Sequence, residues 1–160
     1  MIHGVNKERF LGNCSFRCTH GFPSFKDSEA AIWVSRRNGD KRDIGITSMV
    51  PCTLMPDGRV GYWGDAKPSV DTPIQLMLYR YYKWAKFMLH SHTYIRDAYW
   101  TKKKLPCGAV EEFYEIIKHG NEPNEVGMEI NLRGHGSLVM AADISYLKDI
   151  SYYARPIPEE

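Results

Sequence analysis

The sequence lacks any apolar run long enough to cross a membrane, and its first residues contain no apolar segment typical of a signal peptide. Its net charge is only +2, so charge alone gives no reason to expect a nucleic acid or a membrane surface as partner. Its four cysteines, Cys14, Cys18, Cys52 and Cys107, are too few for a disulfide scaffold. Cys14 and Cys18 have no second pair with which to complete a zinc site. We therefore expect a cytoplasmic protein with reduced thiols.

The composition is that of an ordinary globular protein. Of the 160 residues, 43% are hydrophobic and 25% are charged, and neither repeats nor low-complexity segments interrupt the chain. This length is enough to bury one hydrophobic core. We expect a single domain spanning residues 1–160.

The stretch from Lys67 to His92 organises the rest of the chain. A polar turn precedes Asp71 and Thr72, either of which can cap a helix that Pro73 opens, because proline at the first helical position gives up an N–H that has no partner there. Apolar residues at helical spacing predict one buried face, formed by Ile74, Met77, Leu78, Tyr81 and Ala85.

Two histidines close this stretch. A short apolar run, residues 87–89, predicts a buried strand that ends in His90-Ser91-His92. Residues two apart on a strand point to the same side, so His90 and His92 can present two imidazoles to one point. They can chelate a metal if a third ligand arrives from elsewhere. The alternative is an ordinary strand end at the surface.

Other strands are predicted before this stretch. Asp57-Gly58 predicts a hairpin turn, and the strands are expected at Phe10–Cys18, Ala30–Val34, Ile46–Leu54 and Val60–Trp63. The basic turn that contains Arg36, Asn38 and Gly39 could hold a phosphate through charge-assisted contacts, or it could be a solvated hairpin tip. Asn13 lies in a Gly-Asn turn, where its side chain could simply bond its own backbone.

A second helix is predicted after a basic run at residues 101–104, which we expect to face solvent. Its apolar stripe comprises Val110, Phe113, Tyr114 and Ile117. Three glutamates lie opposite that stripe, at positions 111, 112 and 115. We expect them to face solvent, with the alternative that one of them leans over a site.

A third histidine lies between two glycines. Residues 129–132 and 138–140 predict strands on either side of Arg133-Gly134-His135-Gly136. Because glycine has no side chain, backbone can approach closely beside His135, which suits a metal ligand. Asp143 is expected to cap a final short helix that ends near Ser151.

Taken in order, these motifs resemble the class II aldolase/adducin family, over roughly residues 10 to 150. The motifs that carry the resemblance are Lys67-Pro68-Ser69-x-Asp71-Thr72-Pro73, the helix that follows, His90-Ser91-His92 and Arg133-Gly134-His135-Gly136. Gly12-Asn13-x-Ser15 and the turn at Arg36 to Gly39 stand where that family keeps its phosphate-binding loops.

The resemblance implies an α/β fold, a three-layer α/β/α sandwich with a largely antiparallel central sheet. It also implies a divalent metal, with zinc expected, held by His90, His92 and His135. Asp71 stands where the aldolases have a glutamate base and the 4-epimerase has an aspartate. Asn13, Arg36, Asn38, Gly39 and Ser69 are the expected phosphate-binding residues. The family forms homo-oligomers, typically tetramers.

The implied activity is that of a metal-dependent aldolase, a lyase that acts on a small sugar phosphate through a metal-stabilised enediolate. A nearby carboxylate can move the proton. The alternatives are a sugar-phosphate 4-epimerase of the same family and a non-catalytic interaction module like the adducin head.

The chain departs from the family pattern in three places. Val70 replaces a serine that would give a second hydroxyl to the phosphate. No His-Ala-Asp-Tyr block of the epimerase kind is found between Cys107 and Arg133. Soon after the third histidine the chain ends, and the tyrosines there could replace the family's catalytic tyrosine; they are Tyr146, Tyr152 and Tyr153.

Overall fold

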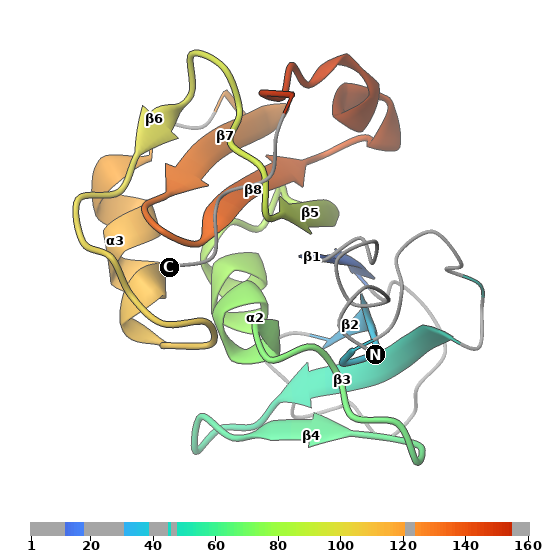
Figure 1. Cartoon of the computed structure of the whole chain (residues 1–160). Helices are drawn as coiled ribbons and strands as arrows, with labels where there is room; N and C mark the ends of the chain where they lie inside the picture. The colour runs from blue at the N-terminus through green and yellow to red at the C-terminus, as the bar shows by residue number, and fades with distance from the viewer. Residues whose placement is uncertain (1–11, 18–30, 39–44, 46–47, 121–123, 155–160) are drawn as a thin grey trace, which may run out of the picture.

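The structure, a computed structural model, describes residues 12–17, 31–38, 45, 48–120 and 124–154, and it is built around one sheet of eight strands (Figure 1). The strands lie in the order β4-β3-β2-β1-β5-β8-β7-β6. Their bounds are Gly12–Arg17 (β1), Ala31–Ser35 (β2), Met49–Leu54 (β3), Val60–Tyr62 (β4), Phe87–Ser91 (β5), Tyr99–Trp100 (β6), Gly127–Leu132 (β7) and Gly136–Ala141 (β8).

Strand β5 lies in the middle of this sheet. It pairs antiparallel with β1 on one side and antiparallel with β8 on the other. His90 lies opposite Asn13 of β1 and opposite Leu138 of β8. Among the described strands only β6 and β7 pair in parallel. The residues at the end of β5 are therefore flanked by backbone from both ends of the chain.

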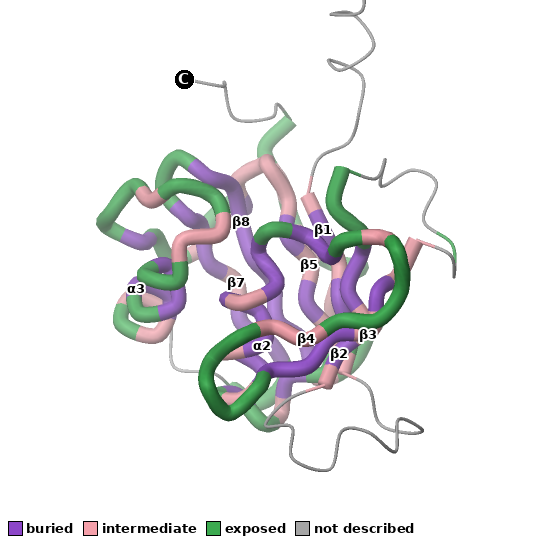
Figure 2. The backbone as a smooth tube through the Cα atoms, turned by 90° about the horizontal axis from the view of Figure 1, so that it is seen from below, coloured by how far each residue is buried: buried purple, intermediate pink, exposed green. Residues whose placement is uncertain are grey.

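Two α-helices of the described ranges pack against this framework. Helix α2 (Thr72–Tyr81) contacts β2, β3 and helix α3 (Glu111–His119). The short 3-10 helix η4 (Ile144–Asp149) contacts β8. Figure 2 shows buried residues running through neighbouring strands, while exposed residues are concentrated in the connecting turns. A mixed sheet with helices agrees with the expected α/β class, but the described residues do not define all three layers of the expected sandwich.

Helix α2 begins as predicted, and the expected apolar residues Ile74, Leu78 and Ala85 are buried, but the buried face also includes polar positions. Proline occupies its first turn, and Asp71 is at the N-cap without a side-chain capping bond. Tyr81, which was expected in the core, is 57% exposed, whereas Gln75 and Tyr79 are fully buried. The prediction was wrong at Tyr81. Polar partners on β1 bury Gln75 and Tyr79 instead, and hydrophobic spacing does not reveal such positions.

Helix α3 buries only part of the predicted stripe, namely Phe113 and, in part, Ile117. Tyr114 is 60% exposed and Val110 is also exposed, although both were expected in the apolar stripe. Glu112 and Glu115 are buried, so the expectation that they face solvent was wrong. Both have partners that make burial possible: Glu112 bonds His135, and Glu115 accepts from the Lys102 N–H and pairs with His119.

Several turn predictions are confirmed. The Gly58 N–H donates to the Met55 carbonyl in the Asp57-Gly58 turn, and the Asp143 side chain accepts from the Ser145 N–H at the start of η4. Thr101 is buried and bound to Arg133, so the expectation of a fully solvated run at 101–104 was wrong at its first residue. The expected strand residues at 10–11, 18, 30 and 46–47, together with Gly39, lie outside the described residues.

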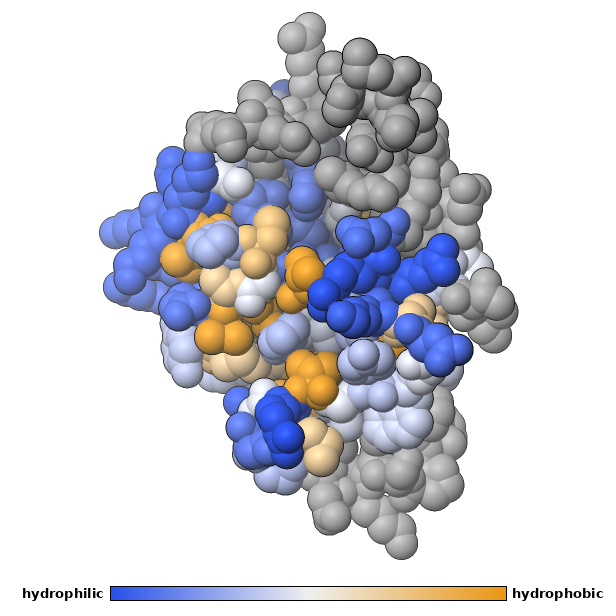
Figure 3. All heavy atoms as spheres, turned by 60° about the horizontal axis from the view of Figure 1, so that its bottom comes forward, coloured by the Kyte–Doolittle hydropathy of each residue, from blue (hydrophilic) through white to orange (hydrophobic). Residues whose placement is uncertain are grey.

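The surface is mixed in character. Figure 3 shows a face on which apolar side chains lie among hydrophilic ones, so that no single kind of side chain covers it. Within the described ranges, no helix is long and apolar enough to span a membrane.

Candidate metal centre

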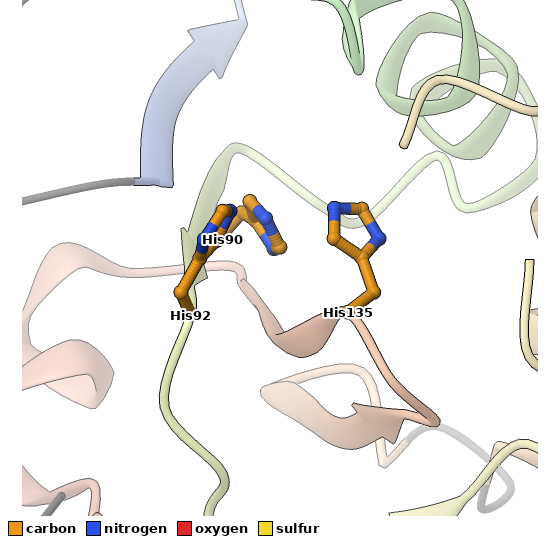
Figure 4. Close-up of side chains that lie close together, drawn as sticks. All are labelled: His90, His92 and His135. Atoms are coloured by element: carbon orange, nitrogen blue, oxygen red, sulfur yellow. The ribbon is translucent and has the colours of Figure 1, made fainter. Parts of the chain in front are cut away.

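Three histidine rings meet at the end of β5 (Figure 4). His90 is in β5, His92 follows it directly, and His135 comes from the turn between β7 and β8. The ring centroids of His90 and His135 are 4.4 Å apart, and those of His92 lie 5.1 and 5.7 Å from them. One nitrogen from each ring lies within 4.8 Å of the other two. The structure therefore brings the three predicted metal ligands together.

Glycine is what lets His135 reach this place. The His135 N–H donates to the Leu132 carbonyl at 2.9 Å, which closes a tight turn. Gly134 and Gly136 have φ angles of 73° and 141°, in the region that side chains disfavour. A Cβ atom on Gly136 would lie 2.0 Å from the Ser91 carbonyl oxygen. The close approach of β8 to β5 that brings His135 to the site therefore requires glycine at 136.

The second nitrogen of two rings is fixed by a hydrogen bond. The His90 Nδ1–H donates to the Ser137 carbonyl at 2.9 Å. The His135 Nδ1 lies 3.0 and 3.1 Å from the two carboxylate oxygens of Glu112, which can only accept when ionised. The proton is thereby held on Nδ1 in both rings, and Nε2 keeps its lone pair for a metal.

Both Nε2 atoms are buried, and neither has a hydrogen-bond partner among the described residues. A buried polar atom without a partner is costly, so its presence in two adjacent rings needs an explanation. Burial lowers the pKa of His90 to about 4, which keeps its ring neutral. Burial acts in the same direction on His135, but the hydrogen bond and charge of Glu112 and the charge of Asp71 raise its pKa above the ordinary value. Two Nε2 atoms aimed at one space fit a borderline divalent cation such as zinc, which imidazoles bind in their neutral form.

Asp71 supplies a carboxylate to the same space. Its Oδ2 lies 3.7 Å from the His90 Nε2, and its Oδ1 lies 3.8 Å from the His135 Nε2. It is held in place by two donors: the Asn13 side-chain amide at 2.9 Å and the Gly108 N–H at 3.1 Å. The side chain is buried, and the residue is at the N-cap of α2.

Glu112 is the site residue that the sequence left open. It was one of three glutamates of which one could lean over a site, and the structure identifies it as the partner of His135. Burial raises its pKa, while the hydrogen bond to His135 opposes that shift. Asp71, Glu112 and His135 form a second group of close ligand atoms. A signal was available, because Glu112 follows the Leu-Pro-Cys-Gly segment at the start of a helix, but its orientation could not be deduced.

The expected phosphate-binding residues are only partly gathered. The turn at Arg36 lies against the Pro-Ser turn, because Arg36 bridges Pro68 and the Ser69 N–H donates to the Ser35 carbonyl. Asn38 is in this turn with a φ of 60°. The Asn13 side chain, in contrast, is bound to Asp71 and Gln75. A phosphate contact by Asn13 stays a prediction, as do those of the other residues.

A cavity of about 290 Å³ lies beside this double turn. Ser69 contributes to its wall, and so do two cations, Lys67 of the Lys-Pro-Ser motif and Arg37, the second arginine of the basic turn. Arg37 also donates from Nε to the Pro68 carbonyl at 3.2 Å. The remaining lining is formed by Val60, Tyr62, Pro68, Val70, Thr72 and Pro73.

Solved structures share this architecture. A sugar-phosphate aldolase from Thermotoga maritima superimposes with a TM-score of 0.62 at 14% identity, over 89% of this chain and 81% of that one. An L-fuculose 1-phosphate aldolase gives 0.58 at 14% identity, over 90% and 71%. The chain has the aldolase fold. YgbL from Escherichia coli, described as a candidate aldolase/epimerase/decarboxylase, gives 0.55 at 11% identity, over 89% and 75%.

The aldolase fold confirms the resemblance to the class II aldolase/adducin family at the level of architecture. No family model matches the sequence, and no curated protein matches it either. At identities of 11–14% the likeness establishes the fold alone, so the reaction has to be argued from the site.

Proposed function

We propose that the protein is a metal-dependent lyase of the aldolase type that acts on a small phosphorylated sugar. The observation that carries this proposal is the pair of buried Nε2 atoms of His90 and His135, which have no hydrogen-bond partner within the described part of the chain and converge with His92 and Asp71. An interaction module without metal would have no need of this costly arrangement. The aldolase fold of the chain supports the same class.

Three histidines and one carboxylate surround the proposed metal position. His90, His92 and His135 would hold a divalent ion, with zinc as the first choice for imidazole ligands. Three protein nitrogens leave a coordination position for substrate. When bound, the ion supplies Lewis acidity to the carbonyl and hydroxyl oxygens of the sugar.

Asp71 is the proposed proton acceptor. Its carboxylate lies at the edge of the histidine cluster, where the reacting carbon would be placed. The donors Asn13 and Gly108 keep it oriented. A carboxylate that is already in position can take a proton without first reorganising, which is how general bases contribute to rate.

The phosphate would be held at the double turn. Ser69 and the basic turn at Arg36 lie side by side, and the cations Arg37 and Lys67 line the neighbouring cavity. Backbone N–H groups and guanidinium groups are the usual partners of a phosphate. Fixing the phosphate there would set the register of the sugar on the metal.

The proposal includes the complete three-layer α/β/α sandwich, a homotetramer and a cytoplasmic location.

A sugar-phosphate 4-epimerase is the second candidate. It is favoured by the residue at position 71, which is an aspartate, as in the epimerase, and not the glutamate of the aldolases. Both reactions need the same metal and phosphate sites, so the geometry separates them poorly.

The deciding experiment is a turnover assay with a panel of ketose phosphates, after metal analysis of the purified protein. Release of an aldehyde and a three-carbon phosphate identifies an aldolase, and formation of an isomer without cleavage identifies an epimerase. The matched control is the unphosphorylated form of each sugar. A protein that binds no divalent metal and turns over none of these sugars would contradict the proposal and favour an interaction module.

A further inference from the structure

A line of buried polar side chains leads from the interior of α2 to Asp71. The residues at 71, 75 and 79 lie four apart, so they share one face of α2. Asn13 and Ser15 lie two apart on β1, so they share the face that meets it. The contacts alternate between helix and strand: Tyr79 to Ser15 (3.0 Å), Ser15 to Gln75 (2.5 Å), Gln75 to Asn13, and Asn13 to Asp71 (2.9 Å).

Only one direction of hydrogen bonding satisfies the whole line. The Asp71 carboxylate accepts only, so Asn13 must turn its Nδ2 toward it. The Asn13 Oδ1 then needs a donor, which is the Gln75 Nε2. The Gln75 Oε1 in turn accepts from the Ser15 hydroxyl. Because that hydroxyl has given its single proton to Gln75, Tyr79 must donate to Ser15.

The burial of this line removes the alternatives that water would offer. Asn13 is 2% exposed and Gln75 is 1% exposed. Burial also raises the pKa of Tyr79, so its hydroxyl keeps the proton that starts the line. In such surroundings a reversed amide would leave a donor or an acceptor without a partner.

We propose that Gln75 is a positioning residue, which fixes the direction of the Asn13 amide and thereby holds the Asp71 carboxylate toward His90 and His135. The side-chain hydrogen bonds of Gln75 within the described residues go to Ser15 and Asn13, not to the histidine cluster. It acts through Asn13, as the middle of a relay in which every donor points toward Asp71. The inference rests on the proposed function only in that Asp71 serves the metal and the substrate.

The first test changes the direction of the relay. Gln75→Glu keeps the acceptor for Ser15 but has no N–H for the Asn13 Oδ1. The Asn13 amide should then turn its Nδ2 toward the new carboxylate and present its oxygen to Asp71. In the cobalt-loaded protein we expect an altered visible absorption spectrum and roughly 10-fold weaker metal binding. In the kinetics we expect kcat to fall by a larger factor than KM changes. Gln75→Met, which removes both bonds without reversing them, should have the smaller effect.

The second test needs no metal. In the double variant Gln75→Glu with Asp71→Asn, the relay can run backwards, because an amide at position 71 can donate to the turned Asn13 oxygen and still accept from the Gly108 N–H. We expect Asp71→Asn to reverse roughly half or more of the decrease in Tm that Gln75→Glu alone causes in the metal-free protein. The side chains of 71 and 75 share no hydrogen bond in the structure, so this rescue would have to pass through Asn13.

Asn131→Asp is the matched control. Asn131 is a buried amide that donates to the Ile95 carbonyl and accepts from the Ile95 N–H, away from the relay. The Asn131→Asp variant should have a lower Tm, as Gln75→Glu does, and Asp71→Asn should not restore that Tm.

Additive losses in the Gln75→Glu and Asp71→Asn pair would overturn the relay, and so would an unchanged cobalt spectrum in Gln75→Glu. Absence of metal binding by the unaltered protein would contradict the proposed function instead, and the metal-free pair would still decide the role of Gln75.

Discussion

The Glu112 carboxylate accepts a hydrogen bond from Nδ1 of His135. Its two carboxylate oxygens lie 3.0 and 3.1 Å from Nδ1, although the two residues come from helix α3 and from the turn between β7 and β8. A carboxylate in this place fixes the tautomer and the ring orientation of a metal-binding histidine, and it makes the other nitrogen a stronger ligand. The proposed metal centre therefore depends on a helix that contributes no predicted ligand of its own.

Glu112→Gln should weaken metal binding. The amide can still accept one hydrogen bond from Nδ1, but it lacks the negative charge that strengthens the opposite nitrogen. We expect a loss of about 10–100-fold in zinc affinity, measured by competition with a chromophoric chelator. Glu111→Gln is the matched control, because Glu111 precedes it on α3 and is exposed. Equal affinities in the two variants would show that Glu112 only fills space.

The local part of the site could be predicted from the sequence. His90 and His92 lie two apart, so the strand period predicts that they share a side. The glycines around His135 predict a close approach of backbone. Both features depend on neighbours along the chain. The structure places these three rings next to one another.

The partners of these residues could not be predicted in the same way. Glu112 resembles a solvent-facing glutamate until the turn of His135 is known to lie over α3. Gln75 likewise looks like a polar position on a helix until β1 places Asn13 and Ser15 opposite it. Hydrophobic spacing assigns polar residues to the surface, so it fails where buried polar groups satisfy each other. That is why the faces of both helices were partly wrong.

Arg36→Ala should impair the use of phosphorylated substrates. If the double turn binds the phosphate, loss of this guanidinium removes a charge-assisted contact worth about 1.5–3 kcal/mol, which corresponds to a roughly 10–150-fold rise in KM. The unphosphorylated analogue should show no such rise. Steady-state kinetics on both substrates provide the measurement.

Arg37→Ala tests the same turn from its other side. Arg37 lines the cavity but also donates to the Pro68 carbonyl, so its loss should lower Tm as well as raise KM. Equal effects of Arg36→Ala on the phosphorylated and the unphosphorylated sugar would mean that the turn is only structural.

Tyr146→Phe should change the pH dependence of stability. Burial, the charge of Glu129 and the hydrogen bond to it raise the pKa of Tyr146 to about 12. An unfolded tyrosine titrates near pH 10, so below that pH its contribution to stability is complete. Between pH 10 and pH 12 the unfolded state loses the proton and the folded state keeps it, so the contribution is lost as pH rises.

Urea unfolding at several pH values measures this effect. Near neutral pH the variant should be less stable by about 1 kcal/mol, through the lost hydrogen bond. The free energy of unfolding should then fall less steeply between pH 10 and 12 in the variant than in the unaltered protein. Parallel curves through that window would contradict the assigned pKa.

His92→Ala should abolish metal retention and leave the fold intact. With metal bound, the three ring nitrogens are expected roughly 2.0–2.2 Å from one ion, with the Asp71 carboxylate bound to it or directly beside it. Removing one of three imidazoles leaves too few ligands for a stable site, so zinc measured by atomic emission should fall from one ion per chain to background. Metal-free Tm and circular dichroism should stay unchanged, because His92 is only half-buried. His119→Ala, which removes a histidine paired with Glu115 and outside the cluster, should keep its zinc; a His92→Ala protein that also keeps zinc and activity would refute the site.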